Sequence, residues 1–246
     1  MRLIVFDFDG TIIDSRRDLA DSTNEMLATY GAAPHAIDDI ALMIGDGAKK
    51  LVERALARSG LDPFEPEALD RFREIYDRRL LATTRPYDGM VDVLGAAGRR
   101  TRLALLSNKP EVPTRRILDA LDLARHFAWV IGGDSGFERK PDPASLEFLI
   151  RESGATPAST LFVGDSAIDA ETARRAGAGL CLVDFGFGKL PASFTLQPGE
   201  SAASHAADVA LAIDRFLGPF SLPCSAKPLE SRTDGPNSAR RAATGE

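Results

Sequence analysis

Short apolar segments bounded by turn residues recur along the chain. They lack the alternation of apolar and polar positions that is typical of a strand with one face in water. Strands buried in a parallel sheet instead show continuous apolar runs. The predicted strands cover residues 3–8, 102–106, 128–131, 160–163 and 180–183.

Segments with helical periodicity lie between these predicted strands. Apolar side chains recur in them at spacings of three and four residues, which places them on one face of a helix. Strands that alternate with helices predict an α/β fold with a doubly wound, mostly parallel sheet. The predicted helices cover residues 90–99, 114–121, 144–153 and 169–176.

The region after the first strand departs from this alternation. It contains no strand pattern, only amphipathic stretches at residues 17–30, 48–59 and 67–80. We therefore predict an all-helical cap, residues 15–82, inserted into an α/β core. That core would consist of residues 1–14 and 83–218, with Pro86 in TTRPYDGM marking the return of the chain. Ser15 and Asp18 have a spacing like that of a capping box, so we expect them to begin the first cap helix.

The last part of the chain has a different composition. Residues 219–246 are rich in Pro, Ser and Gly and poor in large apolar side chains. Such a segment buries too little apolar surface to offset the entropy lost on ordering. We predict a disordered tail and assign it no function.

Composition and charge bear on the class of partner. The 246 residues are 44% hydrophobic and 27% charged, which is typical of a globular protein with a sizeable core. The net charge of −6 provides no basic field for nucleic acid or an anionic membrane. No apolar run has the length of a signal-peptide core or membrane helix, and Cys181 and Cys224 suggest neither a disulfide framework nor a metal site. We expect a cytoplasmic protein, a monomer or homodimer, without nucleic-acid or membrane partners.

Two carboxylates follow the first predicted strand in the sequence FDFDGT. On an extended backbone residues i and i+2 point to the same side, so Asp7 and Asp9 should converge. Ligands of open parallel sheets bind beyond the carboxyl ends of the strands, where further polar residues also lie. These are Ser107 and Asn108 after the second strand, Lys140 on a loop before a helix, and Asp165 with Asp169 after the fourth strand.

Crowding of carboxylates at one point needs a physical reason. Three or four such groups would be destabilised by mutual repulsion unless a cation lay among them. A hard divalent ion with oxygen ligands provides this compensation, and Mg²⁺ in particular retains waters and binds substrate phosphates. The residues therefore predict a site for a hard divalent ion such as Mg²⁺.

The order of the motifs DFDGT, SNKP, KPDP and VGDSAID resembles the haloacid dehalogenase-like hydrolase superfamily, over about residues 2–188. Within that superfamily, MIGDGAKKLVERAL in the helical cap and RPYDGM at its return are similar to the phosphoglycolate phosphatases. The resemblance implies a Rossmann-like core with an inserted cap. It also implies Mg²⁺-dependent hydrolysis of a small phosphomonoester, with 2-phosphoglycolate as the expected substrate and glycolate and phosphate as products.

The resemblance further implies roles for the motif residues. Asp7 would be the nucleophile that forms an aspartyl-phosphate. Asp9 would protonate the leaving alkoxide and then activate the hydrolytic water. Ser107 and the backbone amide of Asn108 would hold phosphoryl oxygens, and Lys140 would supply positive charge and hold the nucleophile.

The implied metal site draws on three of the acidic residues. Mg²⁺ would bind a carboxylate oxygen of Asp7, the backbone carbonyl of Asp9 and the carboxylate of Asp165. Asp169 and Ser166 are expected to lie behind these ligands and to orient them, with Asp169 also capping its helix.

Substrate binding is expected from two glycine-containing segments. Gly10 and Thr11 belong to the first motif. Gly45 and Gly47, in IGDGAKK, stand just before a predicted helix whose first-turn amides form an anion site, with Lys49 nearby. We expect this cap loop to close over the core and receive the carboxylate of 2-phosphoglycolate.

Several alternative functions remain open on the residues alone. One is a phosphatase for a sugar phosphate or pyrophosphate, and another is a phosphomutase like β-phosphoglucomutase. A dehalogenase is disfavoured because it has no alkoxide to protonate and so does not need Asp9. A signalling receiver domain also uses an acidic cluster, but it typically places the acceptor after its third strand and is much shorter. An inactive binding relative is disfavoured because every expected catalytic position is filled.

Overall fold

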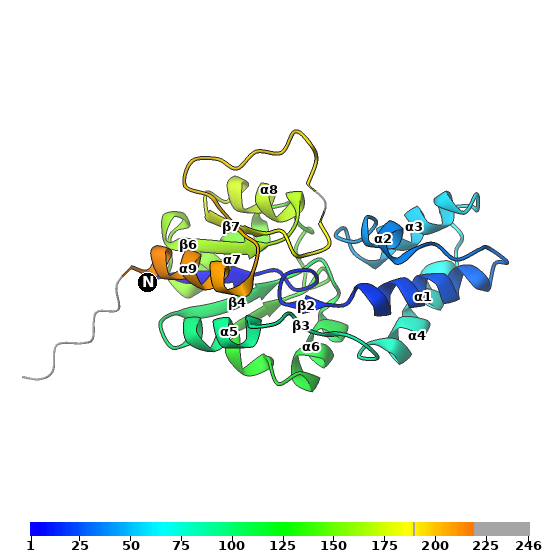
Figure 1. Ribbon diagram of the computed structural model, residues 1–246, viewed down its shortest axis with the longest axis horizontal. Coiled ribbons are helices and arrows are strands. Elements are labelled where there is room, and N and C mark those ends of the chain that lie inside the picture. Colours follow the sequence, from blue (N-terminus) through cyan, green and yellow to red (C-terminus); the bar gives the residue numbers. More distant parts are fainter. Residues whose placement is uncertain (189, 219–246) are drawn as a thin grey trace, which may run out of the picture.

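The computed structural model describes residues 1–188 and 190–218, so the predicted disordered tail lies outside the described residues. A six-stranded parallel sheet forms its core, in the order β5-β4-β1-β6-β7-β8 (Figure 1). This confirms the predicted parallel α/β fold. All five predicted strands are present, and β8 was not predicted. The strands are β1 (Leu3–Phe6), β4 (Arg102–Leu106), β5 (Trp129–Ile131), β6 (Thr160–Gly164), β7 (Gly179–Val183) and β8 (Ser201–Ala203).

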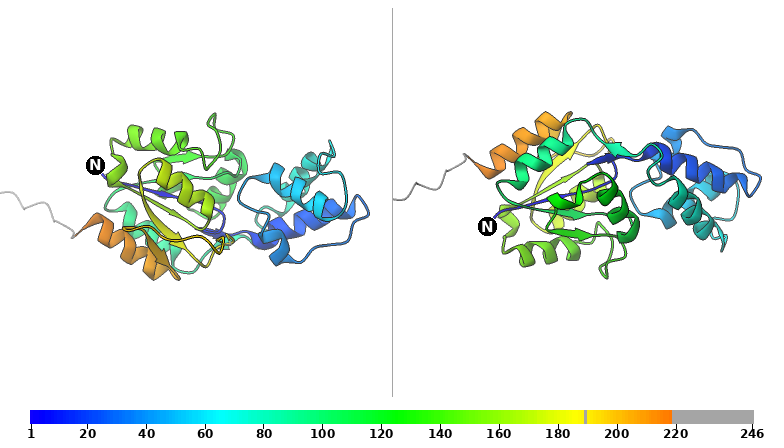
Figure 2. Two further views of the ribbon diagram at one scale, coloured as in Figure 1. Left: turned by 90° about the horizontal axis from the view of Figure 1, so that it is seen from above. Right: turned by 90° about the horizontal axis from the view of Figure 1, so that it is seen from below.

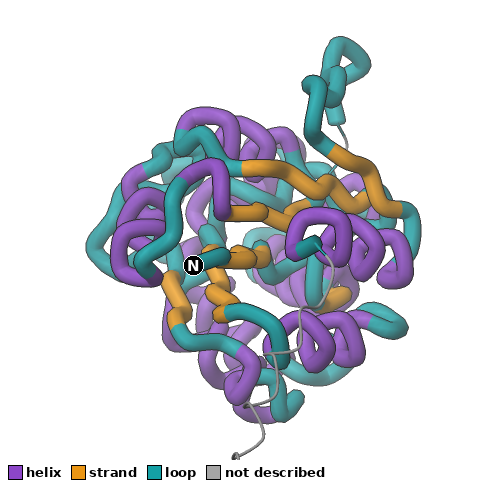
Figure 3. The backbone as a smooth tube through the Cα atoms, turned by 90° about the vertical axis from the view of Figure 1, so that its left-hand side faces the viewer, coloured by secondary structure: helices purple, strands orange, loops and turns teal. Residues whose placement is uncertain are grey.

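Both faces of this sheet are covered by helices. Along β1, Ile4 and Phe6 pack into one core and Leu3 and Val5 into another, which explains the continuous apolar run. Figures 2 and 3 show the strands enclosed between helices. The first face is covered by α5 (Met90–Gly98), α6 (Glu111–Ala120) and α9 (Ala206–Leu217), and the second by α7 (Ala144–Ser153) and α8 (Ala167–Arg175). Short 3₁₀ turns lie at η1 (Ala124–His126) and η2 (Pro157–Ser159).

Four helices lie beyond the carboxyl ends of the strands, on the right in Figure 1. We call them the inserted helices. Helix α1 packs against α2, α3 and α4, and it buries Leu19 and Met26 in their shared core. The predicted helical stretches correspond to three of the four, and α2 was not predicted because it is only five residues long. The inserted helices are α1 (Arg16–Ala28), α2 (Ile37–Ala41), α3 (Ala48–Arg58) and α4 (Ala68–Arg79).

Two short antiparallel strands carry the chain into and out of the inserted helices. They are β2 (Ile13–Asp14) and β3 (Arg85–Pro86). Asp18, which is buried on α1, accepts hydrogen bonds of 2.7–3.0 Å from the backbone N–H groups and hydroxyls of Thr83 and Thr84. The carboxylate of Asp18 thereby ties the start of the inserted helices to their end.

The capping expectation for the start of α1 is corrected by these contacts. Ser15 occupies the N-cap position but makes no side-chain cap hydrogen bond. Its hydroxyl donates instead to Asp9 Oδ1 at 2.5 Å. Asp18 is engaged with the returning chain, so neither member of the expected pair serves the other.

None of the helices in the described ranges has the length and apolar character needed to span a membrane.

Candidate active site

The turn after β1 places two carboxylates at the edge of the sheet. The backbone N–H of Asp7 donates to the carbonyl of Val163 at 2.9 Å, which extends the pairing of β1 with β6. Gly10 has a φ of +88°, and a Cβ there would lie 2.1 Å from a carboxylate oxygen of Asp165. Glycine is therefore required for this turn to approach Asp165 so closely.

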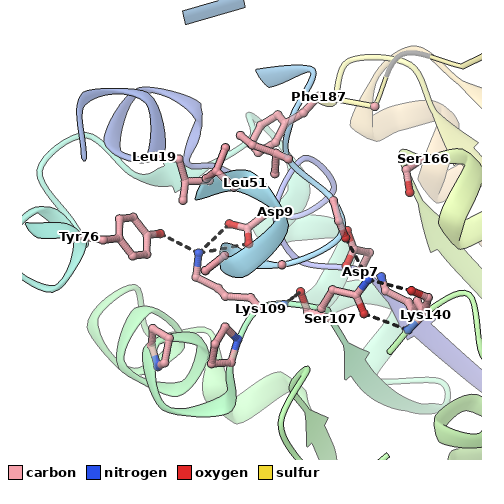
Figure 4. A pocket seen from close by; sticks show the side chains of 18 of the residues that line it. Asp7, Asp9, Leu19, Leu51, Tyr76, Ser107, Lys109, Lys140, Ser166 and Phe187 are labelled. Carbon is pink, nitrogen blue, oxygen red and sulfur yellow. Dashed lines mark hydrogen bonds and ion pairs between the residues drawn. The ribbon is translucent and has the colours of Figure 1, made fainter. Parts of the chain in front are cut away.

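A buried acidic cluster lies at this edge. Carboxylate oxygens of Asp7, Asp165 and Asp169 lie within 4.8 Å of one another. Lys140 Nζ donates to Asp7 Oδ1 at 2.7 Å (Figure 4) and to Asp169 Oδ1 at 2.6 Å. Asp7, which follows β1, and Asp169, in the first turn of α8, are far apart in the sequence but share the Lys140 ammonium group.

Burial strongly perturbs the charges in this cluster. Burial raises the pKa of Asp7 well above its ordinary value. Attraction to Lys140 acts to lower this pKa, and repulsion from Asp169 and Asp165 acts to raise it. Burial and the neighbouring Asp169 raise the pKa of Asp165 to about 7. Burial acts to lower the pKa of Lys140, but attraction to Asp169 and Asp7 outweighs it and the pKa is raised. One ammonium does not balance three carboxylates, so the site can accept a further positive charge.

The donor set suits a hard divalent cation, because it consists of buried carboxylate oxygens. Asp165 Oδ2 is held by the backbone N–H groups of Phe187 and Gly188 at 2.7 and 3.0 Å. Asp169 Oδ2 accepts from the Ser166 hydroxyl at 2.6 Å. These contacts fix the orientation of the Asp165 and Asp169 carboxylates, and the role of Asp169 and Ser166 behind a metal ligand stays a prediction. Phe187 was not among the predicted site residues.

The clustered carboxylates differ in one member from the predicted metal ligands. Sequence reasoning places Asp7, Asp9 and Asp165 at the ion, with Asp9 contributing its backbone carbonyl. The structure groups Asp169 with the other two carboxylates instead. The carboxylate of Asp9 points elsewhere, and a role for its carbonyl stays a prediction.

Asp9 contacts a lysine that sequence reasoning missed. Lys109 Nζ lies 3.1 Å from both Oδ1 and Oδ2 of Asp9 and donates to Tyr76 Oη at 2.6 Å (Figure 4). Burial raises the pKa of Tyr76 to about 12, so its phenol stays neutral at physiological pH. The sequence contains a pointer to Lys109, which belongs to the SNKP motif. Tyr76 lies on α4, outside all of the motifs, so no comparable pointer to it exists.

Ser107 and Asn108 lie at the end of β4, as expected. Ser107 Oγ accepts the backbone N–H of Lys109 at 3.2 Å. The side-chain amide of Asn108 exchanges hydrogen bonds with the backbone of Lys140 at 2.9 and 3.0 Å. It also donates to the carbonyl of Gly45 at 2.9 Å. Asn108 therefore joins two core loops to the loop before α3.

A cavity of about 280 Å³ separates the core from the inserted helices. Gly45 and Gly47 line it, whereas Lys49 is exposed and does not. Gly10 and Thr11 are buried outside the lining, and the Thr11 hydroxyl has no hydrogen-bond partner among the described residues. The core side of the lining includes Asp7, Asp9, Ser107, Asn108, Lys109, Lys140, Asp165 and Ser166, and the inserted side includes Leu19, Gly45, Gly47, Leu51, Arg73, Tyr76 and Leu80.

The parallel sheet with helices on both faces and the acidic site at its carboxyl edge define a doubly wound α/β protein with a Rossmann-like core. The model of the haloacid dehalogenase-like hydrolase family matches residues 4–183, and the chain belongs to this family. This confirms the resemblance of the motifs and favours a hydrolase over a receiver domain.

Several curated relatives and solved structures that resemble this chain are named phosphoglycolate phosphatase. "Phosphoglycolate phosphatase 1" of Pseudomonas aeruginosa is 42% identical over 193 residues, which cover 76% of this chain and 70% of the relative. The phosphoglycolate phosphatase of Rhodospirillum rubrum is 38% identical over 77% of this chain and 82% of its own. A crystal structure described as a predicted phosphoglycolate phosphatase from Haemophilus somnus 129PT superposes with a TM-score of 0.77 at 27% identity, covering 85% of this chain and 96% of that one.

Proposed function

We propose that the protein is a Mg²⁺-dependent phosphatase that hydrolyses 2-phosphoglycolate to glycolate and phosphate. The observation that carries this proposal is the buried cluster of Asp7, Asp165, Asp169 and Lys140, of which Asp7, Asp165 and Lys140 line the cavity. The substrate follows from relatives named phosphoglycolate phosphatase, which are 36–42% identical over 76% of the chain.

Asp7 acts as the nucleophile in this proposal. Its hydrogen bond to Lys140 fixes the orientation of the carboxylate on the cavity floor. Attack by a carboxylate oxygen forms a bond to phosphorus and breaks the bond between phosphorus and the glycolate oxygen. Water then attacks the aspartyl-phosphate at phosphorus, which releases phosphate and regenerates Asp7.

Asp9 acts as the general acid in the first half-reaction and as the general base in the second. In protonated form it donates to the departing glycolate oxygen, and it then takes a proton from the attacking water. Ser15 holds the carboxylate at Oδ1, on the cavity side of the turn after β1. The two aspartates of one motif therefore serve different atoms of the same ester.

The remaining core residues stabilise charge on the phosphoryl group. The Ser107 hydroxyl and the Asn108 backbone amide bind phosphoryl oxygens, and Lys140 supplies positive charge. The residues that would hold Mg²⁺ are Asp7, Asp9 through its carbonyl, and Asp165, and the bound ion would shield the incoming phosphate from the anionic nucleophile.

The inserted helices act as a cap in this proposal. The loop before α3 lies over the cavity, with Gly45 and Gly47 in its lining and Asn108 bonded to the Gly45 carbonyl. Closure of the inserted helices over the core would exclude water from the aspartyl-phosphate until the alcohol has left.

A phosphate-release assay tests the proposal. The substrate panel comprises 2-phosphoglycolate, glucose phosphates, pyrophosphate and nucleotides, each with and without Mg²⁺. We expect the highest kcat/KM for 2-phosphoglycolate and turnover only with the ion. A higher kcat/KM for a sugar phosphate would contradict the substrate, and isomerisation that needs a bisphosphate primer, with little phosphate release, would indicate a mutase.

A further inference from the structure

Three cationic side chains occur among the described residues that line the cavity: Arg73, Lys109 and Lys140. Lys140 is engaged with the acidic cluster. The Arg73 side chain is 57% exposed and pairs with Asp70 on α4. The Lys109 side chain is only 6% exposed, and the proposed chemistry gives it no role.

Lys109 lies on the opposite side of the catalytic motif from Lys140. Its Nζ contacts Asp9 and not the acidic cluster, and Figure 4 shows it between Asp9 and Tyr76. Because Asp9 serves the leaving oxygen, Lys109 marks the leaving-group end of the cavity. Lys140, which holds Asp7, marks the phosphoryl end.

The chemistry of 2-phosphoglycolate favours a cation at the leaving-group end. A single methylene separates its ester oxygen from its carboxylate. A group that binds this carboxylate must therefore lie beside the residue that protonates the ester oxygen. Lys109 Nζ lies in that place, 3.1 Å from both Asp9 oxygens.

The surroundings of Lys109 favour recognition of an anion. Leu19, Leu51 and Leu80 line the same cavity, and their apolar side chains lower the local dielectric and strengthen ionic contacts. Tyr76 Oη accepts one Nζ proton at 2.6 Å, and the Tyr76 ring stacks on Phe72 with centroids 5.7 Å apart. The ammonium is therefore held by a rigid partner that does not depend on Asp9.

We propose that Lys109 is the residue that selects the substrate, by exchanging its contact with Asp9 for the substrate carboxylate while Tyr76 holds Nζ in place. This inference rests on the proposed function and names the group that recognises the glycolate end. It replaces Lys49 as the source of positive charge, because Lys49 is exposed and lies outside the cavity lining.

Lys109→Met tests this assignment with two substrates. Ethyl phosphate carries a methyl group where 2-phosphoglycolate carries its carboxylate, so the ratio of their kcat/KM values isolates recognition of the carboxylate. We expect Lys109→Met to lower this ratio by about 10- to 100-fold, the loss expected for one charge-assisted hydrogen bond, mainly through KM for 2-phosphoglycolate. If ethyl phosphate is turned over too slowly to measure, its binding is measured instead as the constant for inhibition of 2-phosphoglycolate hydrolysis. The variant's effect on this inhibition constant is then compared with its effect on KM for 2-phosphoglycolate. An equal fall for both compounds would show that Lys109 acts only through Asp9 or the fold, which would overturn the inference.

Matched variants sharpen the test. Tyr76→Phe retains the stacked ring and removes the hydroxyl, so it should lower the same ratio by about 2- to 10-fold. This variant carries the test if Lys109→Met fails to fold. Lys50→Met, an exposed lysine on α3 paired with Glu53, should leave the ratio unchanged. A selective loss in Lys49→Met, without one in Lys109→Met, would assign the carboxylate to the first turn of α3 instead.

Failure of the inference can be distinguished from failure of the proposed function. A wild-type protein that does not hydrolyse 2-phosphoglycolate contradicts the proposed function. A wild-type protein that hydrolyses it, with an unchanged ratio in Lys109→Met, contradicts only the role of Lys109.

Discussion

The two sides of the cavity are built by different means. On the core side, Asp7, Lys140 and Asp169 are buried and joined by hydrogen bonds of 2.6–2.7 Å. On the inserted side the lining is largely apolar, and its buried polar contact is the bond between Tyr76 and Lys109. On the core side, Asp7, Ser107 and Asp165 directly follow β1, β4 and β6, and the register of these strands fixes their positions. The inserted side depends on helices that are joined to the core through two short strands. The core side therefore carries most of the buried charge and the inserted side most of the apolar surface, so changes on the two sides should have different effects.

The largest effect should come from removing the nucleophile on the core side. Asp7→Asn should lower kcat by at least about 10⁴-fold, because the amide does not form the acyl-phosphate. Loss of a carboxylate from a crowded buried cluster should leave the melting temperature of the metal-free protein unchanged or raised. Phosphate release and thermal unfolding measure these effects, and turnover within tenfold of wild type would rule out Asp7 as the nucleophile.

Removal of the divalent ion should have the next largest effect. Chelation should abolish turnover, and added Mg²⁺ should restore it. Folding raises the pKa of Asp165 from 3.8 to about 7, so the metal-free protein should lose stability as pH rises through this range. Mg²⁺ competes with the proton, and the rise in melting temperature that it causes should therefore grow with pH up to about 7. A Mg²⁺ effect that declines over this range would contradict the proposed site.

A change where the inserted helices join the core should affect stability rather than chemistry. Asp18→Ala removes the acceptor for Thr83 and Thr84 and leaves buried donors unpaired, so we expect a loss of about 2–4 kcal/mol in unfolding free energy. Urea unfolding measures this loss. Asp21→Ala on the same helix, where the partly exposed Asp21 pairs with the exposed Arg17 at 3.7 Å, is the control and should cost less than about 0.5 kcal/mol. Equal losses would show that Asp18 does not tie the two ends together.

The smallest effect should come from the exposed charge on the inserted side. Arg73→Met should change KM for 2-phosphoglycolate by less than about twofold, because an exposed ion pair contributes little. A tenfold rise in KM would place a substrate contact at Arg73, and the distinction between buried Lys109 and exposed Arg73 would then be wrong.

The sequence predicted the core side of this comparison better than the inserted side. Five strands and the convergence of Asp7, Ser107, Lys140 and Asp165 could be inferred, because apolar runs identify buried strands and parallel strands end at one edge. Strand β8 and helix α9 were missed, since Ser201–Ala203 is a short strand without a strong apolar pattern. The spacing of buried apolar residues in α9 was available but was not used.

The missed site residues share a physical cause. Tyr76 enters the site only through the packing of α4 on α1, and no local pattern in the sequence encodes that packing. The packing of α3 against α1 and α4 leaves Lys49 exposed while Gly47 lines the cavity. Lys109 could have been found within SNKP, but its partners lie on two other segments, so its importance depends on tertiary structure.

The hydroxyl that steadies Asp9 belongs to Ser15, the residue immediately before α1. A tilt of α1 away from the sheet would withdraw this donor, and a shift of α4 would also withdraw Tyr76 from Lys109. Asp7, by contrast, takes its support from Lys140 in the core and would be undisturbed. In the proposed mechanism, an open enzyme would keep its nucleophile aligned while its proton donor is misaligned, which would time ester cleavage to enclosure of the substrate.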